Sequence, residues 1–334
     1  FKKVVQGALG FDFFATLFFT LTRKEESYSS DDWDRHGRYP HEQSLLESHN
    51  LLDRPFLEEY IQFLVAQMTK KGVVVDCEPP RHVLTMDLDF AFQWYARPLS
   101  LVVASLIKSP SRYPGWQTLR AIYKGQKRDP YDVMEAVHQW TEAQGVGLRI
   151  FIPVGKRSSM DRHVDPSNKA FTKWLLQWNE VVDFGLHPTY ALGSWESPRR
   201  REVLASEITY FEDLMNQPCH HVRMHYLRCR PHEDYPRFSS LGIQNDWSMG
   251  YGNRSGFRAG ISRPYRFFEE DKPFNKLLRI HPLPLMDSTF VHHMGSNGLG
   301  DWKQRIGAYL GHAENLAYPL VFNLHNNLIA DQNE

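Results

Sequence analysis

HVLTMD, residues His82–Asp87, is the first of seven short apolar runs that decide the fold of this chain of 334 residues. Each run is short and apolar, as a buried strand is. The other six are GVGLRIFIPVG (Gly145–Gly155), VVDFGLH (Val181–His187), HVRMHYL (His221–Leu227), LGIQND (Leu241–Asp246), LLRIHPLPLMD (Leu277–Asp287) and YPLVFNLH (Tyr318–His325). Helical patterns separate several of these runs. Strands that alternate with helices predict a parallel sheet, either open or closed into a barrel.

The helices are predicted from proline or a capping residue at their starts and from apolar residues at helical spacing. We expect helices over Arg54–Met68, from Asp129 to about Glu142 with Gly145 closing it, over Ser167–Glu180, from Ser197 through Leu214, and over Trp302–Leu310. The stretch GFDFFATLFF (Gly10–Phe19) is predicted to be a buried helix, and the polar stretch Thr20–Pro40 a long loop.

The alternating pattern also divides the chain. Residues 1–75 lack it and are interpreted as an N-terminal extension or the remnant of an upstream domain. Residues 76–334 carry it and are interpreted as one β/α domain.

Composition restricts the class of partner. Lys+Arg and Asp+Glu number 39 each, so the formal net charge is zero. This balance argues against a general electrostatic attraction to nucleic acid or to acidic lipid. No apolar run approaches the roughly 20 residues that cross a bilayer, so no transmembrane segment is expected.

The cysteines bear on the compartment. Cys77, Cys219 and Cys229 form no zinc-binding spacing and leave an odd number. This usage favours a reducing compartment, so a cytoplasmic location is expected. The sequence does not indicate an oligomeric state.

Polar residues recur where the predicted strands end. They are Asp87 with Asp89, His187, His225, Asp246 and His325. In β/α barrels the carboxyl ends of the strands meet at one mouth, where sites are built. The alternative is that these residues form turns or lie in solvent, since Asp is common at strand ends.

Two of these positions suggest how a metal ion could be held. Asp87 and Asp89 are two residues apart, and they share a face if the strand continues. Arg223 and His225 share a face in the same way if HVRMHYL is a strand. An Asp with two His from different strands makes an open three-ligand site for zinc or a similar ion. His221 and His225 have the four-residue spacing of a helical zinc pair, but a strand would hold them roughly 13 Å apart.

Several motifs carry a resemblance to a known family. They are FDFFATLFFTLTRKEES and HGRYP near the start, GLHPTY, HYLR, LGIQNDWSMGY followed by GFRAG, PLPLMDST, and LHNN near the end. Together they resemble a divergent Bacteroidetes-type branch of the polysaccharide deacetylase-like proteins, within the NodB-homology carbohydrate esterases. The likeness covers about residues 8–328. It implies a distorted (β/α) barrel of about seven parallel strands and a metal-dependent removal of acetyl from an N-acetylated sugar or glycan.

The resemblance also implies roles for the acidic residues and the arginine. Asp87 matches the family's catalytic base, which Arg223 would orient. The second, metal-binding Asp of the family is replaced by Leu88, so Asp89 is expected to take that role.

For the histidines, His187 matches the first metal-binding His of the family, and Ala191 stands where the second is expected. His225 is expected to supply the missing imidazole, and His325 to act as general acid. The implied cofactor is one divalent metal ion, zinc first, with cobalt, nickel, iron or manganese as alternatives.

Substrate contacts follow from the same likeness. The backbone N–H of Tyr226 is a candidate to hold the oxyanion, and Asp246 with Trp247 matches an Asp-Trp motif. Tyr190, Trp247 and Tyr251 are candidates to stack on a sugar ring, with core packing as the alternative. Two other functions stay open. One is a non-catalytic carbohydrate-binding relative; the other is hydrolysis of another C–N bond, such as that of a cyclic imide.

Overall fold

The structure is a computed structural model that describes residues 12–28, 33–75, 79–97, 99–108, 114–195, 197–268, 273, 276–293 and 299–331. Cys77 lies outside these residues, whereas Cys219 and Cys229 are buried and form no disulfide among the described residues. No helix among the described residues is long and apolar enough to span a bilayer.

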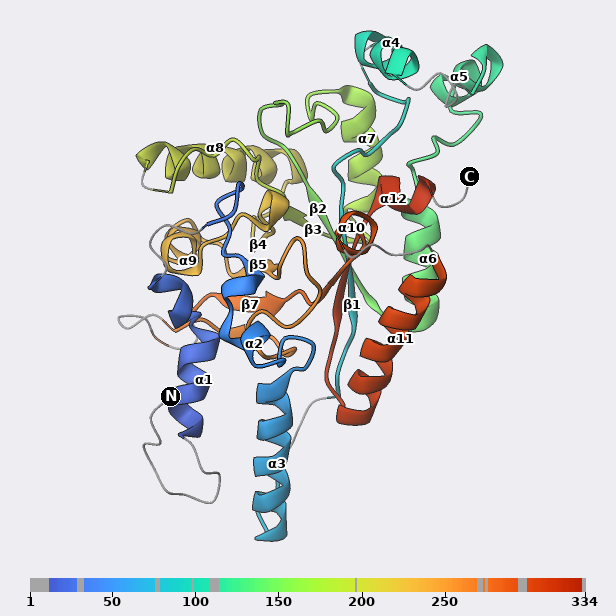
Figure 1. Cartoon of the computed structure of the whole chain (residues 1–334). Helices are drawn as coiled ribbons and strands as arrows, with labels where there is room; N and C mark the ends of the chain where they lie inside the picture. The colour runs from blue at the N-terminus through green and yellow to red at the C-terminus, as the bar shows by residue number, and fades with distance from the viewer. Residues whose placement is uncertain are drawn as a thin grey trace. The chain divides into compact units, whose positions relative to one another are not determined.

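The described residues form one sheet of nine strands, shown with its helices in Figure 1. Its order is β6-β7-β5-β4-β3-β2-β1-β9-β8. The strands are β1 (Val83–Asp87), β2 (Gly147–Ile152), β3 (Asp183–Leu186), β4 (His221–Val222), β5 (Asn245–Met249), β6 (Tyr265–Arg266), β7 (Arg279–Pro282), β8 (Leu285–Met286) and β9 (Val321–His325). Six of the seven apolar runs contain a whole strand, and LGIQND contains only the first two residues of β5.

Most strand pairs are parallel, as the alternating pattern predicts. β2 pairs with β3, β4 with β5, β5 with β7 and β8 with β9 in parallel. β6 pairs with β7 antiparallel and was not predicted, because two residues are too few to produce a sequence pattern. The predicted α/β class, a distorted (β/α) barrel, is confirmed.

The described residues form twelve helices, of which the six predicted ones have shifted ends and the other six were not predicted. They are α1 (Phe13–Leu21), α2 (Leu45–Ser48), α3 (Phe56–Lys70), α4 (Leu99–Lys108), α5 (Trp116–Tyr123), α6 (Met134–Gln144), α7 (Lys169–Trp178), α8 (Pro198–Met215), α9 (Pro231–Ser240), α10 (Asp287–His292), α11 (Leu299–Leu316) and α12 (Asn326–Asp331). Short 3₁₀ helices are η1 (Lys24–Ser27), η2 (His41–Gln43) and η4 (His225–Leu227).

Local caps explain several helix ends. The Ser197 side chain accepts a hydrogen bond from the N–H of Arg199, and Pro198 occupies the first position of α8. Asn168 caps α7 in the same way. Gly145 ends α6 with a φ of 64°, a left-handed conformation that glycine adopts without steric cost.

Helix α1 forms as predicted, but the prediction that it is buried is wrong. Asp12 caps it by accepting a hydrogen bond of 3.0 Å from the N–H of Ala15. Phe13 is buried, whereas Phe14 and Phe18 are 76% and 48% exposed. Helix α1 carries apolar side chains on all of its faces, but only one of these faces packs against the described residues.

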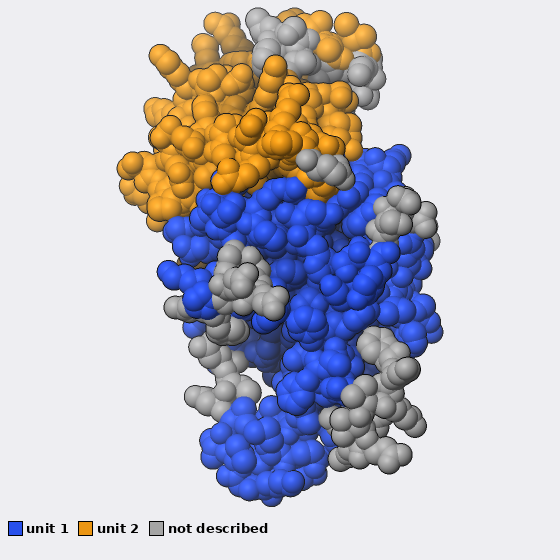
Figure 2. All heavy atoms as spheres, turned by 90° about the vertical axis from the view of Figure 1, so that its left-hand side faces the viewer, with its two compact units in different colours: residues 1–83, 220–323 blue, residues 84–219, 324–334 orange. Residues whose placement is uncertain are grey.

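The chain divides into two compact units (Figure 2). One contains residues 1–83 and 220–323, and the other contains residues 84–219 and 324–334. The proposed domain boundary between residues 75 and 76 stays a prediction. In the structure, residues 1–83 belong to the same compact unit as residues 220–323.

Backbone hydrogen bonds join the N-terminal residues to the later part of their unit. The N–H of Phe257 donates to the carbonyl of Leu52 at 2.8 Å, and the N–H of Leu57 donates to Gly260 at 3.0 Å. The buried Glu58 carboxylate accepts the N–H of Ser262 at 2.8 Å. These bonds fix the start of α3 against the loop of residues 257–262.

A buried ionic cluster connects the same two segments. Glu26, Arg23 and Arg258 are each at most 3% exposed. The Glu26 carboxylate accepts a bond of 2.7 Å from Arg23 Nε and bonds of 3.0 and 2.7 Å from Arg258 Nε and Nη2. Burial alone would raise the pKa of Glu26, but the guanidinium groups of Arg258 and Arg23 hold it below its ordinary value of 4.5.

We expect Glu26→Gln to lower the free energy of unfolding by about 3–5 kcal/mol, because two buried guanidinium groups lose their counter-charge. Chemical denaturation monitored by circular dichroism measures this. Glu42→Gln is the control, because the Glu42 side chain is 63% exposed. A change below about 1 kcal/mol in Glu26→Gln would show that this cluster does not hold the unit together.

Candidate active site

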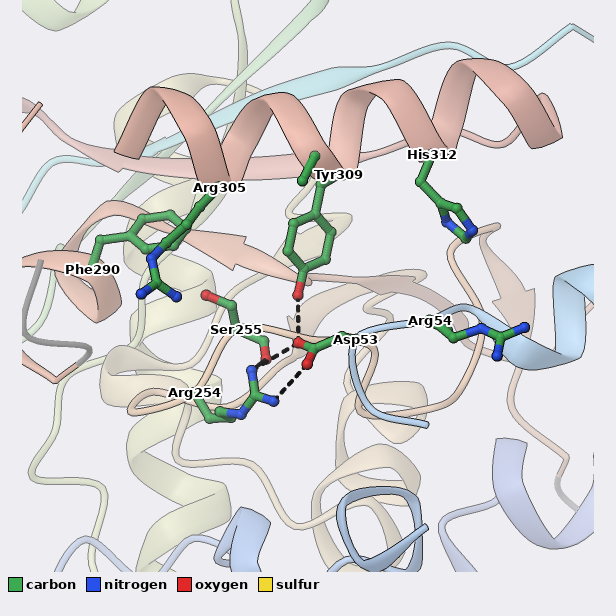
Figure 3. A pocket seen from close by; sticks show the side chains of 9 residues that line it. Asp53, Arg54, Arg254, Ser255, Phe290, Arg305, Tyr309 and His312 are labelled. Carbon is green, nitrogen blue, oxygen red and sulfur yellow. Dashed lines mark hydrogen bonds and ion pairs between the residues drawn. The ribbon is translucent and has the colours of Figure 1, made fainter. Parts of the chain in front are cut away.

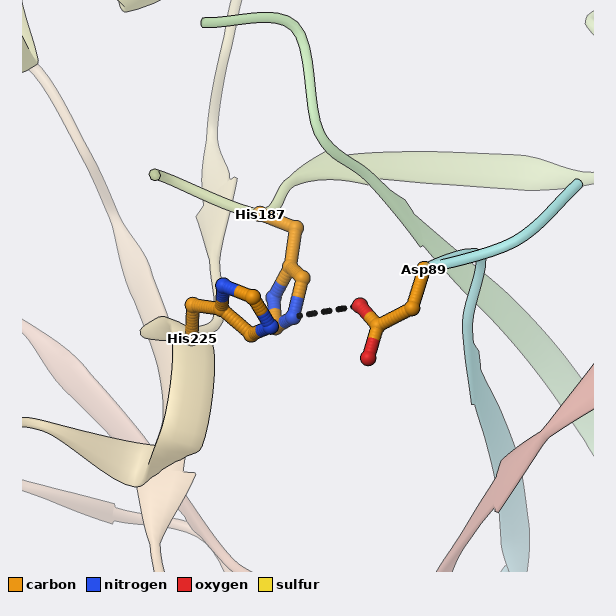
Figure 4. Close-up of side chains that lie close together, drawn as sticks. All are labelled: Asp89, His187 and His225. Atoms are coloured by element: carbon orange, nitrogen blue, oxygen red, sulfur yellow. Dashed lines mark ion pairs between the residues drawn. The ribbon is translucent and has the colours of Figure 1, made fainter. Parts of the chain in front are cut away.

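Asp87 and Asp89 lie at the carboxyl end of β1. Asp87 is the last residue of the strand and is 3% exposed, whereas Asp89 lies beyond it in a turn, with its side chain 20% exposed. The strand therefore does not continue to Asp89, and the condition under which the two carboxylates would share a strand face is not met. Leu88, which occupies the family's second Asp position, is buried at 2% exposure. The turn places the Asp89 carboxylate, and not residue 88, toward His187 (Figure 4).

His187 follows β3 directly and is 2% exposed. Its N–H donates to the carbonyl of Ile152 at 2.9 Å, which continues the pairing with β2. Its Nε2 lies 3.4 Å from Oδ1 of Asp89, the ion pair drawn as a dashed line in Figure 4. Pro188 follows at once and ends the strand.

His325 is the last residue of β9, and its Nε2 lies 3.9 Å from Oδ2 of Asp87. The next residue, Asn326, donates its side-chain amide to the carbonyls of Phe90 and Tyr131 at 2.8 and 2.9 Å. These bonds hold the end of β9 against the loop that follows β1. The unit of residues 84–219 and 324–334 thus contains two carboxylate–imidazole pairs.

His225 lies in a turn, which corrects the predicted strand over His221–Leu227. Strand β4 ends at Val222, and His225 begins the 3₁₀ helix η4. Arg223 and His225 therefore do not share a strand face. Tyr226 and Leu227 have φ values of 59° and 53°, a left-handed conformation that is costly for side chains of this size.

A segment distant in sequence supports this turn. Arg38 Nη1 donates to the carbonyl of Tyr226 at 2.9 Å, and the His36 ring lies 5.0 Å from the Tyr226 ring. Neither residue was predicted to contribute to the site. The signal that could have found them is the HGRYP motif, which contains both.

Asp89, His187 and His225 are, among the described residues, the group that could hold a metal ion. Each offers one ligand atom, and these atoms lie within 4.8 Å of one another (Figure 4). Both histidines are buried. One carboxylate oxygen with two imidazole nitrogens is a donor set that suits zinc and similar divalent ions, so these residues fit the implied cofactor.

The predicted substrate-binding residues differ in exposure. Tyr226 is 39% exposed, and Tyr190 is half-buried, with its N–H donating to Asp161 at 2.7 Å. Asp246, Trp247 and Tyr251 are all buried. A role in sugar binding stays a prediction for all five.

Trp247 and Tyr251 have partners within their own unit. The Trp247 ring stacks on His281 with centroids 3.7 Å apart, and its Nε1 donates to Nδ1 of His221 at 3.2 Å. The Tyr251 hydroxyl accepts a bond of 3.3 Å from Arg23. Tyr251 therefore adjoins the Glu26 cluster.

Asp246 is fully buried in β5. Its Oδ2 accepts bonds of 3.0 Å from the Tyr235 hydroxyl and 3.1 Å from the N–H of Ser248. Burial raises the pKa of Asp246 to about 6, although Ser248, Tyr235 and Arg223 act to lower it.

A separate cavity of about 530 Å³ lies in the unit of residues 1–83 and 220–323 (Figure 3). Arg254 binds both oxygens of Asp53 at 2.8 Å, and the Tyr309 hydroxyl donates to Asp53 at 3.0 Å. Arg305 pairs with Asp301 and Arg54 with Glu59. The basic lining is thus matched by carboxylates. No sequence motif indicated this cavity.

Comparison with known proteins adds the following. Residues 1–73 match a family of unknown function, DUF7033, and this match covers less than half of the chain. No curated protein matches. A presumed polysaccharide deacetylase from Mycobacterium smegmatis is similar over 78% of this chain and 85% of its own, with 13% identity and a TM-score of 0.44. IcaB from Ammonifex degensii is similar over 52% of this chain and 85% of its own, with 14% identity and a TM-score of 0.28.

The raised pKa of Asp246 predicts a pH dependence of stability. Because the folded-state pKa of about 6 lies above the ordinary value of 3.8, folding takes up a proton between these values. The free energy of unfolding should therefore fall as the pH rises from about 4 to about 6. Asp246→Asn should flatten that slope in denaturation curves measured at several pH values. Asp213→Asn, at an exposed position, is the control and should keep the wild-type slope. An unchanged slope in Asp246→Asn would contradict the assignment.

Proposed function

We propose that this chain is a metal-dependent hydrolase that removes the acetyl group from an N-acetylated sugar or glycan. The observation that carries the proposal is the presence of two carboxylate–imidazole pairs at the carboxyl ends of strands. Asp89 and His187 are 3.4 Å apart, and Asp87 and His325 are 3.9 Å apart. One pair suits a metal ion, and the other suits proton transfer.

Asp89, His187 and His225 are the proposed metal ligands. Their donor atoms and mutual proximity support this assignment. When bound, a divalent ion, zinc or else cobalt, nickel, iron or manganese, would polarise the acetamide carbonyl and lower the pKa of a water molecule.

Asp87 is the proposed general base, which takes a proton from the attacking water. Its burial at the strand end keeps its carboxylate in one position. Arg223, which is 0% exposed, is the proposed positioning residue for this base.

His325 is the proposed general acid, which gives a proton to the departing sugar nitrogen. An amine cannot leave as an anion near neutral pH, so the C–N bond breaks only with this proton transfer. The backbone N–H of Tyr226 is the proposed donor to the oxyanion. The bond from Arg38 to the Tyr226 carbonyl supports the turn that holds this peptide.

The sugar ring is proposed to contact Tyr190 and Tyr226, which are both partly exposed. Trp247 and Tyr251 are proposed to stack on the ring only where a rotamer change uncovers them, and Asp246 to bind a sugar hydroxyl on the same condition. In the structure these three residues are buried.

The metal assignment predicts that His187→Gln with His225→Gln abolishes metal binding. Purified wild type should hold about one ion per chain. The double variant should hold less than a tenth of that, measured by elemental analysis after dialysis. His163→Gln is the matched control, because His163 is also buried but binds the carbonyl of Gly155. Equal metal content in the wild type and the double variant would overturn the assignment.

The acid–base assignment predicts that Asp87→Asn and His325→Gln each lower kcat for acetate release by about 10²–10⁴-fold. Chito-oligosaccharides are the test substrates, with released acetate measured enzymatically. Metal content should stay at the wild-type level in both variants, because neither residue is a proposed ligand. Wild-type rates in either variant would contradict its role.

The same assays distinguish the alternatives. Ring opening of a cyclic imide without acetate release would identify a hydrolase of another C–N bond. Saturable binding of chito-oligosaccharides with no hydrolysis, after metal supplementation, would identify a non-catalytic carbohydrate-binding protein.

A further inference from the structure

The segment between Asp89 and Asp129 differs in charge from the rest of the chain. It contains seven lysines and arginines and no aspartate or glutamate, whereas the whole chain has 39 of each sign. The zero net charge therefore conceals a strongly basic segment. This segment contains helices α4 and α5, which lie together at the top of Figure 1.

The side chains that α4 and α5 bury form a small hydrophobic core of their own. Val102 of α4 packs with Leu119 and Ile122 of α5 around Trp94. All four side chains are at most 5% exposed.

Asp129 fixes the base of this segment. Its carboxylate accepts the backbone N–H groups of Gln93, Trp94 and Tyr95 at 2.8–2.9 Å. The chain that leads into α4 and the chain that leaves α5 are thus joined at Asp129, and we call the two helices a hairpin.

The solvent-exposed side chains of α4, α5 and the residues after α5 are both apolar and basic. Ile107 is 75% exposed, Trp116 78% and Val103 53%. Four exposed basic residues follow on and after α5; Arg128 pairs with Glu135, which leaves Arg120, Lys124 and Lys127. We call this set the α4–α5 surface, and it consists of Val103, Ile107, Trp116, Arg120, Lys124 and Lys127.

We propose that the α4–α5 surface binds an anionic lipid bilayer and lies in its interface. Exposed aliphatic and indole side chains gain free energy by entering the boundary between headgroups and acyl chains. Lys and Arg beside them are attracted to anionic headgroups, and Trp is enriched at this depth. The proposal does not depend on the hydrolase assignment, because none of these residues belongs to the candidate active site.

The apolar residues favour a bilayer over an anionic polymer. A polyanion such as a nucleic acid or an acidic polysaccharide gains from the basic residues and from Trp116, but it offers no apolar phase to Ile107 and Val103. An anionic bilayer offers charged headgroups to the basic residues and an apolar phase to Ile107 and Val103.

The test is flotation of the full-length chain with vesicles of phosphatidylglycerol and phosphatidylcholine, compared with vesicles of phosphatidylcholine alone. We expect binding to the anionic vesicles only, weakened when NaCl is raised from 0.1 to 0.5 M. Arg120→Glu/Lys124→Glu/Lys127→Glu should lower the partition coefficient by at least about a hundredfold, since each basic residue contributes about fivefold. Ile107→Ser/Trp116→Ala should lower it by at least about tenfold.

Matched controls lie in the same unit. Lys169→Glu/Lys173→Glu/Arg201→Glu makes the same charge change at exposed positions on α7 and α8. Trp140→Ala removes an indole that is 53% exposed on α6. Both controls should bind anionic vesicles within about threefold of wild type, since general charge effects are screened over a Debye length of about 10 Å at 0.1 M salt. Thermal unfolding verifies that all four variants are folded.

Three results would overturn the proposal. They are absence of binding to anionic vesicles, an equal loss in the α7–α8 control, and unchanged binding in Ile107→Ser/Trp116→Ala. The last result, together with retention on immobilised polygalacturonate that the Arg120→Glu/Lys124→Glu/Lys127→Glu variant loses, would identify an acidic polymer as the partner instead.

Discussion

Parallel strand pairing is the constraint on which the candidate active site depends. In a parallel sheet the carboxyl ends of neighbouring strands lie at the same edge, and the residues that follow them meet there. β2 pairs with β3 in parallel, and β1 lies between β2 and β9 in the sheet order. Asp87 and His325, which are far apart in the sequence, therefore lie with Nε2 of His325 3.9 Å from Oδ2 of Asp87. The chemistry proposed for this chain is a consequence of that topology.

Much of the fold could be predicted from the sequence, because the strands of a parallel sheet are buried on both faces and appear as short apolar runs. The same pattern indicated the acidic and imidazole side chains at the strand ends. Strand β4 was predicted too long, because the turn at Tyr226 is held by Arg38, a contact across 188 residues that no local pattern reveals. Glu26 was likewise not identified as buried, since its burial depends on Arg258. Long-range ionic contacts are the part of this structure that periodicity does not encode.

The distribution of charge in the fold likewise does not follow from the net charge of the whole chain. A formal net charge of zero describes the whole chain, but folding groups the charges by segment. Within one unit it produces a carboxylate–imidazole site at the strand ends and a hairpin with exposed basic residues. In the other unit, arginines are matched by carboxylates both in the core and around the cavity of Asp53. Average composition therefore constrains the fold class better than it constrains the partners.

The Glu26 cluster has a consequence for how such chains diversify. Sequence matching marks residues 1–73 as a family of their own, yet the carboxylate at residue 26 is neutralised by an arginine at residue 258. An N-terminal segment exchanged by recombination between homologous genes would place this buried carboxylate opposite a foreign residue. Inheritance of the first 75 residues is thus coupled to that of the loop around Arg258, and the two regions are expected to covary among relatives as one evolutionary unit.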